Sequence, residues 1–158
     1  MPFRIGHGFD VHRLEKGETL IIGGKTIPWE KGTVAHSDGD VLLHAIMDAL
    51  LGALALGDIG THFPDTDPEY KDVNSLHLLE QIAHLIKKEG YTIHNIDSTM
   101  MLQQPKLKKH IPDIQLNIAN CLNLDRAQVS IKATTTEKLG FIGREEGVAA
   151  EAVVLLSS

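Results

Sequence analysis

The sequence contains little of what marks several classes of protein. One cysteine among 158 residues excludes an internal disulfide and fits a reducing cytosol. Aromatic residues make up only 4%, so the core of a single chain is modest and a homo-oligomer is favoured. No apolar run approaches the ~18–20 residues of a membrane helix, and the N-terminus lacks the basic and then apolar pattern of a secretory signal. We therefore expect a cytoplasmic protein.

An excess of positive charge is also missing. The net charge is −6 and the pI is about 5.8, which argues against a nucleic-acid groove. A phosphate ligand would then need local devices such as metals, backbone amides and a few basic side chains. The hydrophobic share of 42% and charged share of 23% are ordinary for a globular chain and exclude disordered, coiled-coil and collagen-like proteins. The length predicts a single domain over residues 1–158.

The order of apolar patterns predicts an α+β fold, with one mixed β-sheet covered by helices. A sheet covered on one face leaves its other face in need of a partner. Asp38 is expected to cap the first helix, while residues 29–37 and 58–71 are expected to be loops. Strands are predicted over residues 3–11, 20–22, 25–27, 91–102, 129–134 and 148–156, and helices over 39–56, 75–89 and 107–122.

Asp10 and His12 are two residues apart on a predicted strand, so their side chains point to the same face. A carboxylate and an imidazole on one face can act as two ligands of the same metal ion. A catalytic zinc site also requires a third protein ligand and an open position. His44, in the first turns of the predicted helix, is the candidate for the third ligand. The alternative is a core histidine bonded to a carbonyl group.

Three aspartates surround His44 in the sequence. Asp38 and Asp40 can serve simply as helix caps that favour the helix dipole. Asp40 and Asp48 each lie four residues from His44, and either could bond the imidazole nitrogen that does not face a metal.

Two further segments carry polar side chains of functional type. The loop over residues 57–67 places Phe63 between polar clusters, as in loops that close over small polar molecules; ordinary turn chemistry is the alternative. Thr134, Thr135 and Thr136 end a predicted strand before Glu137. Hydroxyl and N–H groups there can hold an anion, and Glu137 a hard cation. The alternative is a threonine-rich edge strand with a solvated charge. Residues 143–147, which follow, are expected to form a charged hairpin turn into the last strand.

Taken together, these segments resemble one family closely. The resemblance rests on residues 6–12 (GHGFDVH), 35–40 (AHSDGD) through His44, 57–60 (GDIG), 63–67 (FPDTD) and 132–141 (KATTTEKLGF), in order and spacing. The family is 2-C-methyl-D-erythritol 2,4-cyclodiphosphate synthase, of the non-mevalonate isoprenoid pathway. The resemblance covers almost the whole chain.

The resemblance implies a homotrimer with active sites at the subunit interfaces. It implies a zinc ion held by Asp10, His12 and His44, and a second divalent ion, magnesium or manganese, held by Glu137 and the substrate diphosphate. It also implies that the 2-phosphate of a cytidine-diphosphate substrate attacks the β-phosphate, which yields the cyclic diphosphate and CMP. The monoester is mostly dianionic at neutral pH, because its second pKa is about 6, so no general base is required.

Site residues follow from the same resemblance. His36 and Thr135 are the candidates for donors that strengthen in the transition state. Phe9, Arg144 and Glu146 match an axial cavity of the trimer that is associated with isoprenoid-like ligands, and Glu145 stands where a small residue is expected. The expected walls for the methylerythritol phosphate are His36, Ser37, Asp58, Ile59, Gly60, Phe63, Pro64, Asp65, Thr66 and Asp67. The stretch expected to hold cytosine is Leu102, Gln103, Gln104, Pro105, Lys106, Leu107 and Lys108. The other expected substrate contacts are Asp10, Val11, His12, Thr134, Thr135, Thr136, Glu137, Phe141 and Arg144.

Two other classes of function stay open from the residues alone. A zinc-dependent phosphohydrolase would use the same open site to activate water. A non-catalytic trimeric module that binds nucleotides would use the three ligands only for structure.

Overall fold

The computed structural model describes residues 2–158. Its main sheet has the strand order β4-β1-β7-β5-β6, and β2 and β3 form a separate hairpin. The strands are β1 (Phe3–Lys16), β2 (Leu20–Ile22), β3 (Lys25–Ile27), β4 (Lys31–Val34), β5 (Thr92–Met101), β6 (Val129–Thr134) and β7 (Gly147–Ser157). The pair β5–β6 is parallel and the other pairs are antiparallel. This confirms the expected mixed sheet.

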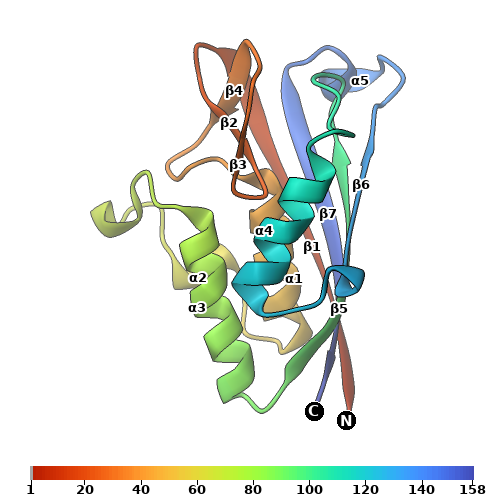
Figure 1. Cartoon of the computed structure of the whole chain (residues 1–158). Coiled ribbons are helices and arrows are strands. Elements are labelled where there is room, and N and C mark those ends of the chain that lie inside the picture. Colours follow the sequence, from red (N-terminus) through yellow and green to blue (C-terminus); the bar gives the residue numbers. More distant parts are fainter. Residues whose placement is uncertain (1) are drawn as a thin grey trace.

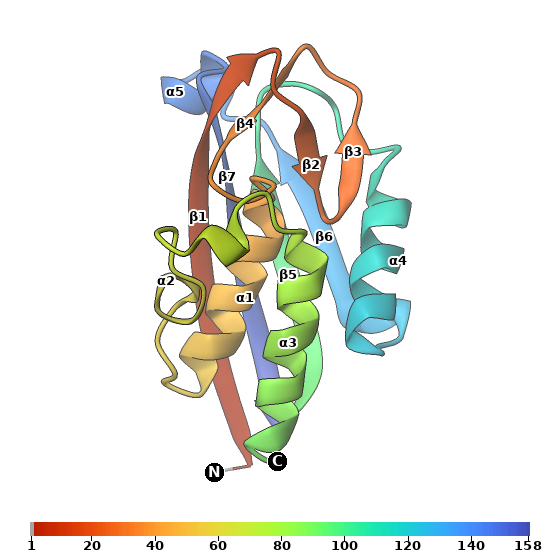
Figure 2. The same ribbon diagram turned by 90° about the vertical axis from the view of Figure 1, so that its left-hand side faces the viewer.

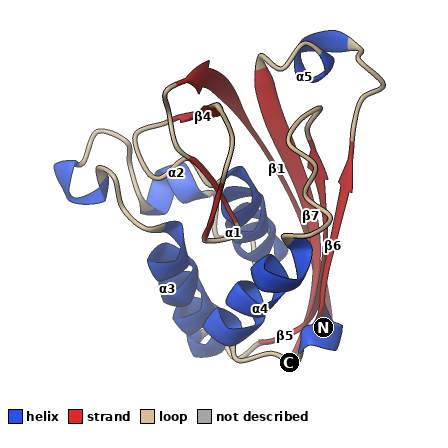
Figure 3. Ribbon diagram, turned by 45° about the horizontal axis from the view of Figure 1, so that its top comes forward, coloured by secondary structure: helices blue, strands red, loops and turns tan. Residues whose placement is uncertain are grey.

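The longer helices lie together on one face of that sheet (Figures 1 and 3). The helices are α1 (Val41–Ala53), α2 (Ile59–His62), α3 (Ser75–Lys88), α4 (Ile111–Leu122) and α5 (Gly140–Gly143), with the short 3-10 turns η1 (Pro68–Tyr70) and η2 (Arg126–Gln128). Helix α1 is buried on nearly every side, which is typical of a helix packed between a sheet and a second layer. None of the helices in the described chain has both the length and the apolar character needed to cross a membrane.

Strand β1 presents its apolar side chains away from the helices. Phe3, Ile5, Phe9 and Val11 are 45–75% exposed, whereas Gly6 and Gly8, on the opposite face, are buried. The alternation of period two correctly predicted a strand, but the apolar side of the strand is the open one. The sheet therefore has a helix-covered face and an open face with apolar side chains.

Two glycines allow α1 to lie directly on β1. A Cβ added to Gly6 would lie 1.8 Å from the carbonyl oxygen of Ala49, and one added to Gly8 would lie 1.9 Å from that of Ala45. Neither position has room for any side chain. The backbones of β1 and α1 therefore meet, which brings the N-terminal turn of α1 against the middle of β1.

The start of α1 differs from the prediction. The N-cap is Asp40 and not Asp38, since Oδ1 of Asp40 accepts the N–H of Leu43 at 3.1 Å. The same carboxylate accepts the N–H groups of Gly23 at 2.9 Å and Gly24 at 2.7 Å. Asp40 thus joins the β2–β3 turn to α1, a contact with a distant part of the chain that local sequence does not reveal.

Other boundaries also shift. The predicted loop over residues 29–37 contains β4, because the chain there pairs with the end of β1, from Arg13 opposite Val34 to Lys16 opposite Lys31. The loop over residues 58–71 contains α2 and η1, and the expected hairpin turn at 143–147 follows the short helix α5. Helix α4 begins at Ile111 with a proline in its first turn, where proline is tolerated.

Candidate metal centre and active site

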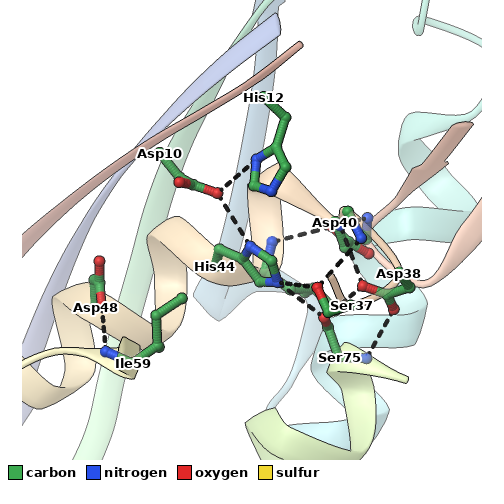
Figure 4. Close-up of polar contacts among 12 residues, drawn as sticks. Asp10, His12, Ser37, Asp38, Asp40, His44, Asp48, Ile59 and Ser75 are labelled. Carbon is green, nitrogen blue, oxygen red and sulfur yellow. Dashed lines mark hydrogen bonds and ion pairs between the residues drawn. The ribbon is translucent and has the colours of Figure 1, made fainter. Parts of the chain in front are cut away.

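Asp10, His12 and His44 come together as the sequence predicted (Figure 4). Oδ2 of Asp10 lies 3.0 Å from Nδ1 of His12 and 3.1 Å from Nδ1 of His44. One ligand atom from each residue lies within 4.8 Å of the others, and this is the one such group of three found among residues 2–158. Strand β1 supplies two of the residues, and α1 supplies the third through its contact with the glycines.

This donor set fits a divalent ion. Nδ1 of His12 is buried, and its 3.0 Å approach to Oδ2 of Asp10 lacks the geometry of a hydrogen bond, so its lone pair is available to a metal. Nitrogen and oxygen ligands at about 2.0–2.2 Å from a tetrahedral zinc lie roughly 3.3–3.5 Å from one another, close to the distances found here. Two imidazoles and one carboxylate are the donors that zinc accepts with one position left open.

The charges of the cluster are coupled. Burial raises the pKa of Asp10, but its contacts with His12 and His44 outweigh burial and bring that pKa down to about 2. Burial lowers the pKa of His44, but Asp10 together with the charges of Asp40 and Asp38 raises it above its ordinary value. Asp10 is therefore a charged ligand atom for a cation, and any proton on Nδ1 of His44 must leave when a metal binds there.

The expected partners of the other His44 nitrogen were wrong. Nε2 of His44 lies 3.1 Å from Oγ of Ser75 and 3.3 Å from Oγ of Ser37, and not beside Asp40 or Asp48. Asp40 caps the helix, and Asp48 accepts the N–H of Ile59 at 2.8 Å. Burial raises the pKa of Asp48.

A pocket of about 340 Å³ opens beside the cluster. It brings together most of the residues that the resemblance assigned to the methylerythritol phosphate. Those lining it are His36, Ser37, Ile59, Gly60, Phe63 and Asp65. The rest of the lining consists of the three residues of the metal cluster with Val34, Ala35, Met47, Tyr70, Val73 and Leu78. Phe63 packs edge-on against Tyr70, with ring centres 5.3 Å apart, so one wall is aromatic.

The remaining residues of that loop lie at the rim. The side chain of Asp58 caps α2 and that of Asp67 caps η1. Pro64 and Thr66 are exposed and do not line the pocket. The backbone carbonyl of Asp67 lies 3.4 Å from Nε2 of His36, which links the loop to the pocket wall.

A second pocket, also of about 340 Å³, lies at the ends of β5 and β6. It is lined by Leu102, Gln103, Pro105, Lys106, Leu107, Lys108, Ile111, Ala133, Thr134 and Thr135. The stretch expected to hold cytosine and two of the three threonines, Thr134 and Thr135, therefore line the same pocket. No described residue lines both this pocket and the one beside the metal cluster.

The segment after β6 is tightly turned. Glu137 and Lys138 have positive φ angles of 55° and 64°, which non-glycine residues adopt rarely and mostly at turns or functional sites. The N–H of Glu137 donates to Oγ1 of Thr135 at 3.2 Å, and that of Lys138 donates to Oε1 of Gln103 at 3.1 Å. These bonds hold the backbone of the turn beside Thr135 and Gln103, which line the second pocket, and the side chain of Glu137 is exposed.

The other predicted positions border these two pockets. Val11 and Phe141 line a hollow of about 580 Å³ with Glu145 and Glu146, and this hollow shares His12 with the metal pocket. Gln104 lines another hollow beside Trp29, which shares Pro105, Lys106 and Lys108 with the second pocket. Arg144 and Glu146 form an exposed ion pair of 3.0 Å.

Comparison with known proteins assigns the chain to a family. A profile of the YgbB family matches residues 3–157. A 2-C-methyl-D-erythritol 2,4-cyclodiphosphate synthase from Geobacillus sp. (strain WCH70) is 60% identical over 154 residues, covering 98% of each chain. The chain belongs to this family. The chain is thus a cyclodiphosphate synthase of the type that serves the non-mevalonate isoprenoid pathway.

Solved synthase structures share the fold. The bifunctional IspDF from Campylobacter jejuni matches with a TM-score of 0.94 and 48% identity, over 98% of this chain and 42% of that one. IspF from Plasmodium falciparum, in a CDP complex, matches with a TM-score of 0.87 and 38% identity, over 99% of this chain and 96% of that one. The synthase fold therefore accounts for nearly all of the chain.

The outer contacts of the metal cluster were missed by sequence reasoning. Asp38 and Ser75 meet only because α3 begins beside the loop that precedes α1, 37 residues away in sequence. Tyr70 and Val73 line the pocket from a loop whose path no local pattern predicts.

Proposed function

We propose that this synthase converts 4-diphosphocytidyl-2-C-methyl-D-erythritol 2-phosphate to 2-C-methyl-D-erythritol 2,4-cyclodiphosphate and CMP, as a phosphorus–oxygen lyase. The convergence of Asp10, His12 and His44 at the mouth of a polar pocket carries the proposal. Because the 2-phosphate is mostly dianionic at neutral pH, the obstacle is repulsion between two anions and the geometry of ring closure. Positioning and electrostatics can lower such a barrier without a general base.

The metal-binding residues fit this chemistry. A divalent ion held by Asp10, His12 and His44, which we take to be zinc, would supply positive charge against the phosphates. Glu137 is the ligand proposed for a second ion, magnesium or manganese. It stands alone as a carboxylate on its turn, so that site would depend on oxygens of the substrate diphosphate.

Thr135 is suited to donate to a phosphate oxygen. Its Oγ1 already accepts the N–H of Glu137, so the proton of the hydroxyl remains for the substrate. His36 is placed differently, since a carbonyl oxygen only accepts and Nε2 of His36 must therefore carry a proton toward Asp67. To donate to the phosphate through Nε2, His36 must release that carbonyl.

The two pockets support a shared active site. One chain places the metal cluster and the cytidine stretch in separate hollows, and a substrate with a diphosphate between its two ends would need both. The open face of the sheet, with Phe3, Ile5, Phe9 and Val11 exposed, would be covered in an assembly. We therefore propose a homotrimer in which each active site combines the metal pocket of one subunit with the cytidine pocket of its neighbour.

Phosphorus NMR of the purified protein with zinc, magnesium and the cytidine substrate tests the reaction. A cyclic diphosphate formed together with CMP supports the proposal. Inorganic phosphate without a ring would identify a phosphohydrolase, and an unchanged spectrum with tight nucleotide binding would identify a binding module. The matched control is the His44→Ala variant, which should stay folded and lose both zinc and product.

A further inference from the structure

His44 of the metal cluster is hydrogen-bonded to a buried serine, Ser75, on another helix (Figure 4). Nε2 of His44, on α1, lies 3.1 Å from Oγ of Ser75, the first residue of α3. Ser75 is fully buried and His44 is 7% exposed. Water therefore does not compete freely for this contact.

Ser75 is held in turn by the carboxylate of Asp38. Its hydroxyl donates to Oδ1 of Asp38 at 2.6 Å, and its N–H donates to Oδ2 at 2.8 Å. Both carboxylate oxygens are used, so the position of Ser75 is set by two charge-assisted bonds. No expected substrate contact falls on either residue.

The direction of these bonds decides which nitrogen of His44 carries a proton. A carboxylate only accepts, so the single hydroxyl proton of Ser75 points to Asp38. Oγ of Ser75 can then only accept from His44, which places a proton on Nε2. The nitrogen left to bind a metal is Nδ1, the atom that faces Asp10.

Ser37 does not impose the same direction. Its Oγ is farther from Nε2 of His44, at 3.3 Å, and accepts the N–H of Gly39 at a long 3.4 Å. Its proton is not fixed by a carboxylate, so its hydroxyl can donate or accept. The choice of tautomer therefore depends on Ser75.

We propose that Asp38 and Ser75 are positioning residues that hold the proton of His44 on Nε2 and so present Nδ1 as the metal donor. The proposal rests on the metal site of the proposed function and adds the residues that orient it. Partners of this kind fix both the ring and the tautomer of a metal-bound histidine, and their loss costs about 10–100-fold in metal affinity or activity. Because Ser75 opens α3, the same bonds tie the cluster to the end of the loop that walls the pocket.

Zinc affinity, measured by competition with a chelator and without substrate, is the first readout. Ser75→Ala should weaken zinc binding at least about 10-fold, with Ser37 preventing a complete loss. The matched control is Asn74→Ala, which removes a cap at the same helix end, the bond from the N–H of Leu76 to Oδ1 of Asn74. This control should change the melting temperature but leave zinc affinity within about twofold.

Nitrogen NMR of the zinc-loaded protein reads the tautomer itself. The unsubstituted protein should show His44 with zinc on Nδ1 and a slowly exchanging proton on Nε2, and Ser75→Ala should lose that slow exchange. Asp38→Asn should also weaken zinc binding, but the double variant should bind no worse than Ser75→Ala alone, because Asp38 acts through Ser75.

Specific results would overturn the proposal. Unchanged zinc affinity and an unchanged Nε2 proton in Ser75→Ala would do so, as would fully additive effects of the two substitutions. Failure of the unsubstituted protein to bind zinc would overturn it together with the metal site. A protein that behaves as expected toward zinc but makes no cyclic product would instead overturn only the proposed reaction.

Discussion

Gly8 of β1 lies against the carbonyl oxygen of Ala45 on α1, with no space for a side chain between them. A Cβ at Gly8 would come within 1.9 Å of that oxygen. Asp10 and His12 continue the same face of β1, and His44 precedes Ala45 on α1. The metal cluster is therefore built on a contact between two backbones, and its geometry depends on a residue that has no functional group.

Gly8→Ala should consequently damage both stability and metal binding. The helix must move away from the strand, and we expect a loss of about 3 kcal/mol or more, which lowers the melting temperature by roughly 6–12 °C, together with zinc content well below one ion per chain. Gly52→Ala is the matched control, because its Cβ would meet nothing closer than the carbonyl oxygen of His7 at 3.9 Å. Calorimetry and metal analysis of both variants check this; equal behaviour of the two would contradict it.

The metal-free protein should lose stability as the pH rises above neutral. The pKa of His44 is raised in the fold by Asp10, Asp40 and Asp38 despite burial. Its contribution is fully present below the unfolded value of about 6.5 and is lost as the pH rises through the higher folded value. Asp10, with its pKa near 2, stays ionised throughout this range.

Zinc should act in the opposite direction, because binding requires His44 to be deprotonated. The gap between the melting temperatures with zinc and with a chelator should therefore widen from pH 6 to pH 8.5. His44→Gln, which does not titrate, should flatten the curve of the metal-free protein. A metal-free curve that keeps its slope in this variant would mean that another group is responsible.

Glu137→Gln should separate the two metals. The amide is a poorer ligand for a hard cation than the carboxylate, so the magnesium concentration needed for half-maximal activity should rise about 10-fold or more, while zinc content stays the same. Glu18→Gln, at an exposed turn, serves as the control. Superimposable magnesium titrations of the Glu137 variant and the unsubstituted protein would remove Glu137 from the metal site.

Ile5→Asp should dissociate the proposed trimer. Ile5 is 75% exposed on the open face of the sheet, and a charge placed in a buried interface there is costly. Light scattering should report a mass near that of one chain, and activity should fall with it because the two pockets no longer meet. Leu116→Asp, on α4 and 42% exposed, should leave the mass unchanged. A trimer that persists in Ile5→Asp would place the interface elsewhere.

Local rules predicted the elements and the ligands but not the contacts between them. The period of two placed Asp10 and His12 on one face, and the helical pattern placed His44 in the first turns of a helix. By contrast, Asp38 and Asp40 are the same residue type two positions apart, and only the folded chain shows that Asp40 caps α1 while Asp38 holds Ser75.

The sequence also does not reveal which face of β1 packs against the helices. Its apolar residues look like core, yet they point away from the helices because Gly6 and Gly8 fill the inner face. A glycine reads locally as a break in a strand, and its role in close packing exists only once a helix lies on it. Long-range contacts of this kind determine the geometry of the metal cluster, and local sequence does not show them.

The two ends of the described chain, Pro2 and Ser158, meet far from the metal cluster. Phe3 pairs with Ser157, and the N–H of Ser158 donates to the carbonyl oxygen of Pro2 at 2.9 Å, so both ends lie together at one tip of the molecule (Figure 2). Along β1, the seven residue steps from Phe3 to Asp10 span roughly 23 Å. A short linker could therefore join the ends into a circular permutant, opened at the Gly17 turn, with the metal cluster left intact. The same tip is a natural anchor for fusion or immobilisation.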